Sequence, residues 1–318
     1  MSKVHFSIIV VTHNSEDCIT TALSSIYRQQ PEVDEVIVVD NGSVDKTIEL
    51  VQGSFPRALL ITNQKNEGAC KARNQGVEVS KGEWIMTLDC DAILETGFTY
   101  HIQEAIRTVS SDVGIIQPKI LMSDAKTIYS LGIYLSPMRR FFDIKHGYQD
   151  KQDSDIREVF GACAAAAVYR RTMLEELEEK TGYFDERFFF LVEDVDLAWR
   201  AYRKGWKAVL YPQALCYHSG NSSHMDKRFR QYLCFRNRFY SIVKNEGIAG
   251  YSKKILPIFF YDFPRLCYLA FSNPYLHTDI MRMLRFCIRN HMLYTNDPVF
   301  FQKNTAADSS RRLKHRED

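Results

Sequence analysis

The sequence lacks the patterns of a disulfide-bonded, zinc-binding or exported protein. Its eight cysteines are scattered and form no CxxC pair, so no zinc or redox site is expected, and we interpret them as reduced thiols of a cytosolic protein. The N-terminal stretch MSKVHFSIIVVTHN holds an apolar run too short for a signal-peptide core, which predicts no export signal. A disordered or collagen-like composition is also absent, because 45% of the residues are hydrophobic and 25% are charged.

The chain as a whole has no large excess of one charge sign, but its two parts differ in charge. The formal net charge is only +2 over 318 residues, yet residues 225–318 carry 17 Lys and Arg against 8 Asp and Glu. Residues 1–224 carry 24 against 31. The basic tail predicts an anionic partner, for which a membrane surface and nucleic acid are the usual choices. A solvated helical face is the alternative.

The first half of the chain alternates short β-branched runs with helix-like segments. This alternation is typical of βαβ units around a mostly parallel sheet. Five runs are expected to form buried strands: FSIIVVT (6–12), EVIVVD (35–40), ALLIT (58–62), EWIMTLD (83–89) and DVGIIQ (112–117). Helices are expected within 15–30, ending before Pro31, and within 67–82, ending at Gly82 as a C-cap.

Polar clusters follow these strands, at the sheet edge where open α/β sheets bind ligands. No GxGxxG follows the first strand and no P-loop motif occurs in the chain, so both of these nucleotide sites are disfavoured. Two carboxylates spaced i, i+2 can offer oxygens to Mg²⁺ or Mn²⁺ beside phosphate groups. Asp89 and Asp91 are therefore candidates for a metal and diphosphate clamp, and acids that only cap a strand are the alternative.

The succession of these motifs resembles a known family. Five segments are similar in order and content to motifs of the inverting glycosyltransferases of family 2, which have a GT-A fold: VVTHN (10–14), VVDNGSVD (38–45), NEGACKARNQG (66–76), TLDCDAIL (87–94) and LVEDVDLAWR (191–200). The segment YPQALCYHSGNSS (211–223) resembles the branch that contains bacterial rhamnosyltransferases. The resemblance covers residues 1–224 and implies a nucleotide-sugar donor, a divalent metal, and transfer to an acceptor hydroxyl with inversion.

The resemblance also implies which residues meet the donor. They are Thr12, Asn14, Asp40, Asn66, Arg73 and Asp89. Thr12 and Asn14 would line the nucleoside pocket, and Asp40 would accept hydrogen bonds from the base or ribose, as an acceptor-only group can. Arg73 would reach the diphosphate with its fork of donors, and Asp89 would meet the sugar or its ribose. A turn role for Asp40 and an exposed helical position for Arg73 are the alternatives.

Two residues are assigned to the metal, Mn²⁺ or Mg²⁺. Asp91 is the main ligand that the resemblance implies, and His218 matches a position that completes the metal shell from a distant part of the chain. A neutral imidazole suits Mn²⁺ better than Mg²⁺, and a structural histidine is the alternative. The segment GACAAAAVYRR (161–171) resembles the part of the family that lies beneath the acceptor, while a close-packed strand explains its small residues equally well.

Asp194 is the predicted catalytic residue. It lies in a helix expected to begin near Glu193 and to stop at Gly205. By the resemblance, Asp194 is the general base that takes the proton from the acceptor hydroxyl, and a single displacement needs only one such carboxylate. Acids in a first helical turn also complement the helix dipole, which is the alternative for both Glu193 and Asp194. Asp196 and Arg200, spaced i, i+4, are expected to pair with one another.

Residues 225–318 match no motif of the family and are expected to form a basic helical extension. The run 252–273 is apolar but is interrupted by prolines and charges, so it is a poor membrane span. A helix over 278–292 would carry Arg282, Arg285 and Arg289 along one face. This predicts peripheral docking on an anionic membrane surface, and a helical cap or homo-oligomer interface is the alternative.

The sequence thus predicts an α/β, GT-A protein in three parts: residues 1–118 bind the nucleotide-sugar, 119–224 bind the acceptor and catalyse, and 225–318 extend the fold. The expected function is transfer of one sugar, rhamnose from dTDP-rhamnose, to a glycan or lipid-linked glycan in cell-surface polysaccharide synthesis. The expected partners are a dTDP- or UDP-linked sugar donor and that acceptor. We expect a cytoplasmic protein, peripheral on the inner membrane surface, with no nucleic-acid partner. A processive synthase is disfavoured because no QxxRW follows, and a sugar nucleotidyltransferase because VVTHNSED replaces its glycine-rich loop. A catalytically idle scaffold is the alternative from another class.

Overall fold

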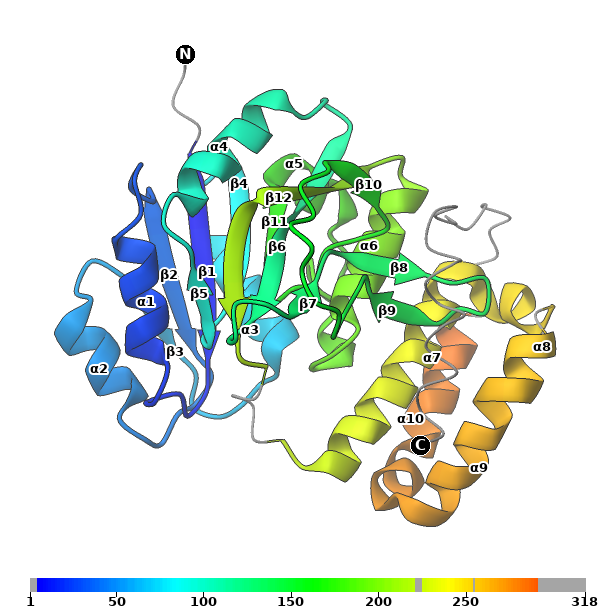
Figure 1. Cartoon of the computed structure of the whole chain (residues 1–318). Coiled ribbons are helices and arrows are strands. Elements are labelled where there is room, and N and C mark those ends of the chain that lie inside the picture. Colours follow the sequence, from blue (N-terminus) through cyan, green and yellow to red (C-terminus); the bar gives the residue numbers. More distant parts are fainter. Residues whose placement is uncertain (1–4, 221–224, 254, 291–318) are drawn as a thin grey trace.

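One mixed β-sheet runs through the molecule and carries helices on both faces (Figure 1). The computed structural model describes residues 5–220, 225–253 and 255–290. The main strands are β1 Phe6–Thr12, β2 Glu35–Asp40, β3 Leu59–Thr62, β4 Trp84–Asp89, β6 Val113–Met122, β10 Arg157–Val159, β11 Ala166–Arg170 and β12 Lys207–His218. Their order is β10-β12-β6-β11-β4-β1-β2-β3. The short strands are β5 Ala92–Leu94, β7 Ile128–Ser130, β8 Ile133–Leu135 and β9 Phe141–Asp143.

The predicted α/β architecture is confirmed, and its sheet is mostly parallel in the first half. β3, β2, β1 and β4 run parallel to one another, and β11 enters antiparallel between β4 and β6. In β1, Ile9 packs on one face of the sheet, and Ile8 and Val10 pack on the other; all three are fully buried. Burial on both faces explains why the central strands are continuous apolar runs. The prediction that 58–62 forms a buried strand was wrong in its burial, because β3 is the edge strand and none of its residues is buried.

The predicted ends of the strands agree with the structure except where distant pairing intervenes. β1 and β2 have the predicted bounds. The strand predicted over 112–117 continues to Met122, because β12 pairs with it until His218 lies opposite Met122. The local sequence of β6 does not indicate that β12 pairs with it.

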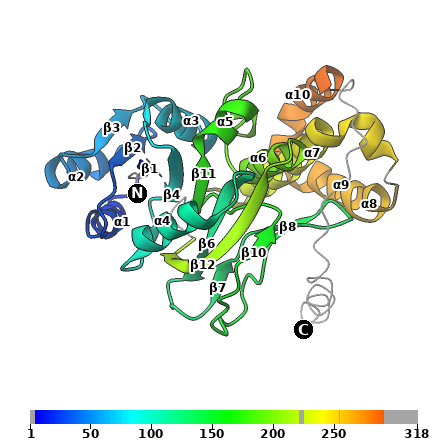
Figure 2. The same cartoon turned by 90° about the horizontal axis from the view of Figure 1, so that it is seen from above.

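Six helices cover the two faces of the sheet (Figure 2). α1 Ile19–Tyr27, α2 Thr47–Ser54 and α4 Phe98–Thr108 pack on one face, and α3 Ala69–Val79, α5 Arg171–Leu177 and α6 Glu193–Arg203 pack on the other. α6 begins at Glu193 and is followed by Gly205 at φ 88°, as predicted.

The predicted end of α3 at Gly82 was wrong. The helix ends at Val79 with Ser80 as its C-cap. Gly82 has a different role, because its N–H donates to Ser7 Oγ at 2.8 Å. A Cβ on Gly82 would lie 2.6 Å from that same oxygen, so the glycine permits a close approach to β1 rather than ending a helix.

Residues 225–253 and 255–290 form a helical unit beside α6, made of α7 Lys227–Ser252, α8 Ile255–Pro257, the π-helical turn η2 Ile258–Asp262, α9 Phe263–Ser272 and α10 Pro274–Asn290. The predicted pair of Asp196 and Arg200 is present, with Arg200 Nε 2.9 Å from Asp196 Oδ2. Lys244 of α7 joins the pair with its Nζ 2.9 Å from the same oxygen. Over the described residues, no helix has the length and apolar character needed to cross a membrane.

Candidate donor-binding and catalytic site

The carboxyl ends of β2, β1 and β4 bring three predicted donor residues to one edge of the sheet. The strand register sets Thr12 opposite Asp40, and Val11 opposite Asp89. These residues therefore lie side by side, because parallel strands end at the same edge. The edge is where polar side chains replace the apolar runs.

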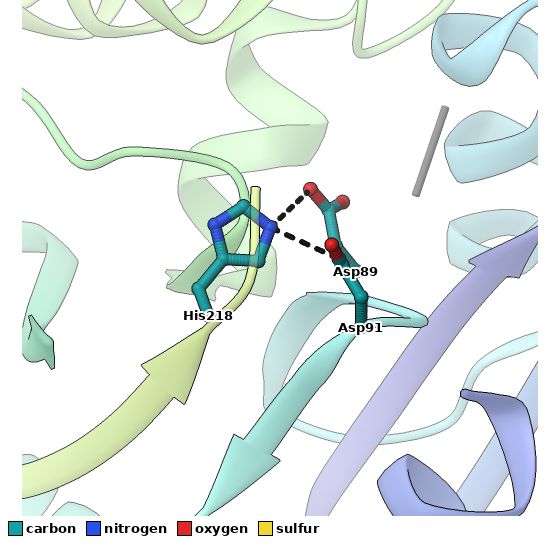
Figure 3. A group of neighbouring side chains, drawn as sticks. All are labelled: Asp89, Asp91 and His218. Atoms are coloured by element: carbon teal, nitrogen blue, oxygen red, sulfur yellow. Dashed lines mark ion pairs between the residues drawn. The ribbon is translucent and has the colours of Figure 1, made fainter. Parts of the chain in front are cut away.

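A group of two carboxylates and one histidine forms at this edge (Figure 3). β4 ends at Asp89, and β5 begins just after Asp91 and pairs with β12 so that Ala92 lies opposite His218. His218 Nε2 lies 3.0 Å from Asp91 Oδ1 and 3.6 Å from Asp89 Oδ2. The pairing of β5 with β12 thus joins residues that are distant in the sequence.

The chemistry of this group fits a divalent cation. Each of the three residues offers a ligand atom, and these atoms all lie within 4.8 Å of one another. Burial alone would lower the pKa of His218, but the hydrogen bond and the charges of Asp91 and Asp89 raise it above its ordinary value. The two carboxylates thus favour positive charge at this position, which a bound metal ion would also supply. Gly220 N donates to Asp91 Oδ2 at 3.1 Å and fixes the carboxylate.

Asp194 lies in the first turn of α6 and is only partly exposed. Its Oδ2 accepts a hydrogen bond from Ala164 N at 3.1 Å, and its Oδ1 accepts one from Val195 N at 2.8 Å. Burial of the carboxyl, together with the negative charge of Glu193, raises the pKa of Asp194 to about 7. A base with this pKa exchanges protons readily near neutral pH.

Arg73 connects the two ends of the site. Its guanidinium is buried, donates to Glu193 Oε1, and lies 3.1 Å from Asp89 Oδ1. These carboxylates outweigh the effect of burial and raise the pKa of Arg73 above its ordinary value, so the charge is held firmly. Contact of Arg73 with a diphosphate stays a prediction, and it requires these ion pairs to open or be shared.

The remaining donor residues take part in turns at the strand ends. Asp40 is fully buried and accepts from Ser43 N at 2.9 Å and from Ser43 Oγ at 2.5 Å, the turn arrangement that DNGS favours. Asn14 Oδ1 accepts from Val44 N at 2.9 Å, and Asn66 Oδ1 accepts from Gly68 N at 3.0 Å. Thr12 Oγ1 is buried and has no hydrogen-bond partner among the described residues. Their contacts with a nucleotide stay predictions.

A contact that the sequence did not predict holds the segment before Asp194. Phe189, Leu191 and Val192 have positive φ values of 66°, 70° and 73°, which are costly for residues other than glycine. Asn237 of α7 donates from Nδ2 to the carbonyls of Phe188, Phe190 and Leu191 at 2.9, 2.8 and 2.7 Å. We call this set of contacts the Asn237 clasp.

The Asn237 clasp explains why the strained backbone persists. Asn237 is fully buried, and its Oδ1 accepts from Arg236 Nε at 2.9 Å, so the whole amide is used. Arg236 adds a bond from Nη2 to the carbonyl of Phe188 at 2.8 Å. The only sequence signal was a polar pair within an aromatic helix, which is too common to single out.

Comparisons with known proteins agree with this geometry. The family model described as glycosyl transferase family 2 matches residues 7–178. The chain is 25% identical over 196 residues to the putative glycosyltransferase EpsH of Bacillus subtilis (strain 168), covering 58% of this chain and 54% of that protein. It is 20% identical over 220 residues to the poly-beta-1,6-N-acetyl-D-glucosamine synthase of Staphylococcus aureus (strain MSSA476), covering 66% and 48%. The chain spans about half the length of these curated relatives.

A solved structure supports the fold. The structure of GalNAc-T7 with UDP, GalNAc and Mn²⁺ superposes with a TM-score of 0.58 at 12% identity, over 76% of this chain and 48% of that one. At this identity the likeness concerns the fold, which is GT-A. Because the family model covers more than half of the sequence, the chain belongs to glycosyl transferase family 2.

Proposed function

We propose that this chain is an inverting glycosyltransferase that moves one sugar from a nucleoside diphosphate to an acceptor hydroxyl. The observation that carries the proposal is that one dipeptide, Ala164–Ala165, is hydrogen-bonded to both ends of the site. Ala164 N donates to Asp194, and the carbonyl of Ala165 accepts from Asp89 N at 2.9 Å. The candidate base Asp194 and the candidate clamp residue Asp89 are therefore bonded to adjacent residues of the chain.

The proposed reaction is a single displacement. The acceptor oxygen forms a bond to the anomeric carbon while Asp194 takes its proton, and the bond from that carbon to the diphosphate breaks with its electron pair on the leaving group. When bound by Asp91 and His218, Mn²⁺ or Mg²⁺ supplies positive charge that stabilises the leaving diphosphate. No acid is then needed on the leaving-group side.

Donor contacts follow from the edge of the sheet. We assign the nucleoside to Thr12, Asn14 and Asp40, with Asn66, Arg73 and Asp89 nearer the diphosphate and sugar. This division supports residues 1–118 as the donor half and 119–224 as the acceptor half of one GT-A domain. The sheet crosses that boundary, because β6 spans it.

The sugar and the acceptor are proposed from the resemblance and from what the similar proteins are named for. Rhamnose from a dTDP-linked donor is supported by the resemblance of residues 211–223, and a UDP-linked donor by the UDP named in the GalNAc-T7 structure. A glycan or lipid-linked glycan acceptor in polysaccharide synthesis is supported by the named activity of the Staphylococcus aureus relative. We propose a cytoplasmic location at the inner membrane surface, with self-association of the helical unit as the alternative.

A thermal-shift panel tests the proposal. The melting temperature is measured with dTDP-rhamnose, UDP-sugars and GDP-mannose, each with and without Mn²⁺. The true donor should stabilise the chain only with the metal, by about 2.7 kcal/mol at a hundred times its Kd. Asp91→Asn should lose this shift, whereas Asp194→Asn should keep it and lose transfer. A catalytically idle scaffold predicts that neither substitution alters nucleotide release, and absence of a shift with every nucleotide-sugar contradicts the proposal.

A further inference from the structure

We infer that the segment α8–η2–α9 docks on a bilayer that contains anionic lipid, with its apolar face among the headgroups. The inference specifies which surface makes the membrane contact that we proposed above. It rests on the proposed function only to explain why the enzyme would work at a membrane. Its evidence is the distribution of apolar and charged side chains over the helical unit.

Exposed large apolar side chains concentrate in one part of the chain. Of the eighteen that are exposed in the described residues, six are spread over residues 5–220 and twelve fall between 255 and 288. The most exposed include Phe271 at 94%, Ile255 at 71% and Phe260 at 68%. Scattered single residues are normal on a protein surface, but a contiguous apolar set marks an interaction site.

The exposed residues of α8–η2–α9 lie on one face. Ile255, Phe259 and Phe263 follow one another at four-residue intervals, and all three are exposed, so they share a side of the helical segment. We call this the outer apolar face; it also includes Leu256, Phe260, Leu266, Tyr268 and Phe271. Figure 1 shows α8 and α9 on the side of the helical unit away from the sheet.

The buried face of the same segment holds a charged residue as well as apolar ones. Asp262 is buried there, pairs with Arg238 of α7, and accepts from Tyr251 Oη at 2.6 Å. Leu269 is the buried apolar residue of α9. The segment therefore turns an ion-paired acid inward beside Leu269 and its phenylalanines outward, whereas a surface helix usually keeps its large apolar side chains inward. Exposed phenylalanines are unfavourable in water and become favourable when an apolar phase, such as the lipid of a bilayer, covers them.

The charges of the helical unit select an anionic partner. Three of its acids, Glu246, Asp262 and Asp279, are buried and paired with arginines. The exposed basic side chains are Lys227, Arg228, Arg230, Lys253, Arg282 and Arg285. The remaining acid of the unit is Asp226, which caps α7 by accepting from Phe229 N. The surface of the unit is positive because three of its four acids are buried in ion pairs. Basic residues beside an apolar face favour binding to anionic headgroups.

Two other occupants fit these observations less well. A second copy would bring two positive surfaces together, and like charges at an interface oppose association. Insertion across the bilayer is not supported, since no helix among the described residues is suited to span it. The expected arginine stripe of α10 contributes Arg282 and Arg285, both exposed; the side chain of Arg289 lies outside the described residues.

Vesicle flotation tests the inference with the full-length chain. Vesicles of phosphatidylcholine alone are compared with vesicles of phosphatidylcholine and phosphatidylglycerol, at low and high salt. The chain should bind the anionic vesicles at low salt, and less well at high salt. Phe259→Ser, Phe260→Ser and Phe271→Ser together should weaken this binding about tenfold or more, because their apolar surface no longer leaves water.

A matched variant controls for the loss of exposed apolar area as such. Tyr100 and Ile156 are exposed at 53% and 54% outside the helical unit, and Tyr100→Ser with Ile156→Ser should bind vesicles like the unaltered chain. Equal binding to neutral and anionic vesicles, or full binding by the triple variant, would overturn the inference. So would a dimer in light scattering that the triple variant abolishes while vesicle binding is absent. The metal-dependent donor shift should persist in every variant, which separates failure of this inference from failure of the proposed function.

Discussion

The Asn237 clasp makes a direct prediction about catalysis. Asn237→Leu keeps the size of the side chain but removes the amide that donates to the carbonyls of Phe188, Phe190 and Leu191. The left-handed backbone that leads to Asp194 then loses the contacts that hold it. We expect a modest loss of stability and a large loss of transfer rate.

The loss of stability should be smaller than the loss of rate, because relief of backbone strain offsets part of the free energy of the lost hydrogen bonds. An amide has two protons to share among the three carbonyls. The carbonyl of Phe188 keeps its bond from Arg236 Nη2, so two carbonyls lose their donor, which costs about 2 kcal/mol at about 1 kcal/mol per bond. Relaxation of the left-handed residues returns part of this, because each stores about 1–3 kcal/mol. The segment therefore moves, and a shift of about 1 Å in a reacting group lowers a rate about a hundredfold.

The assay measures release of nucleoside diphosphate with the donor identified by the thermal-shift panel, using membrane extract as the source of acceptor. Ile242→Ala is the matched control, because Ile242 is fully buried on the same helix and its truncation costs about 2–5 kcal/mol. Well below both melting temperatures, the control should keep kcat while Asn237→Leu loses it. Equal kcat values for the two variants at equal stability would refute the reasoning.

Four further outcomes are expected. The transfer rate should rise with pH through about 7, where Asp194 loses its proton, and Glu193→Gln should move this inflection to lower pH because it removes a charge that raises the pKa of Asp194; an unshifted profile would count against Asp194 as the base. The raised pKa means that the folded chain binds more protons than the unfolded chain between about pH 4 and 7, so Asp194→Asn should gain stability relative to the unaltered chain as pH rises across that window, as measured by urea unfolding. His218→Ala should abolish the Mn²⁺-dependent melting shift, and in the unaltered chain that shift should grow with pH as the imidazole loses its proton. Gly68→Ala should lower stability by about 1–3 kcal/mol, because the new Cβ would lie 2.6 Å from Phe189 at φ +90°, whereas Gly53→Ala meets nothing within 4 Å and should not destabilise.

Local sequence signals predicted the parts of the fold that local structure determines. The bounds of β1 and β2 followed from continuous β-branched runs, because burial on both faces favours apolar side chains through the middle of such strands. The start of α6 at Glu193 followed from acids in a first turn, and its end from Gly205. The close positions of Thr12, Asp40 and Asp89 followed from the rule that parallel strands end at one edge.

The parts that the sequence did not predict depend on distant partners. The end of α3 was misplaced because Gly82 is needed for its approach to Ser7, a contact that no helix rule contains. The ion pairs of Arg73 with Glu193 and Asp89 join three segments, and the sequence showed only that each was polar. The positive φ values of Leu191 and Val192 were unpredictable for the same reason, since the backbone there is set by α7 and not by its own residues.

The pairing of β5 with β12 has a consequence for how the protein is made. Gly220 and Asp91 are 129 residues apart in the sequence, yet they are hydrogen-bonded beside the candidate metal site. Because a ribosome delivers the chain from its N-terminus, Asp89 and Asp91 emerge long before His218 does. A nascent chain therefore has every predicted nucleoside contact before it has a complete cation site. In the proposed mechanism, tight donor binding needs β12 in the sheet, so metal-dependent nucleotide binding would report that this strand has joined the sheet.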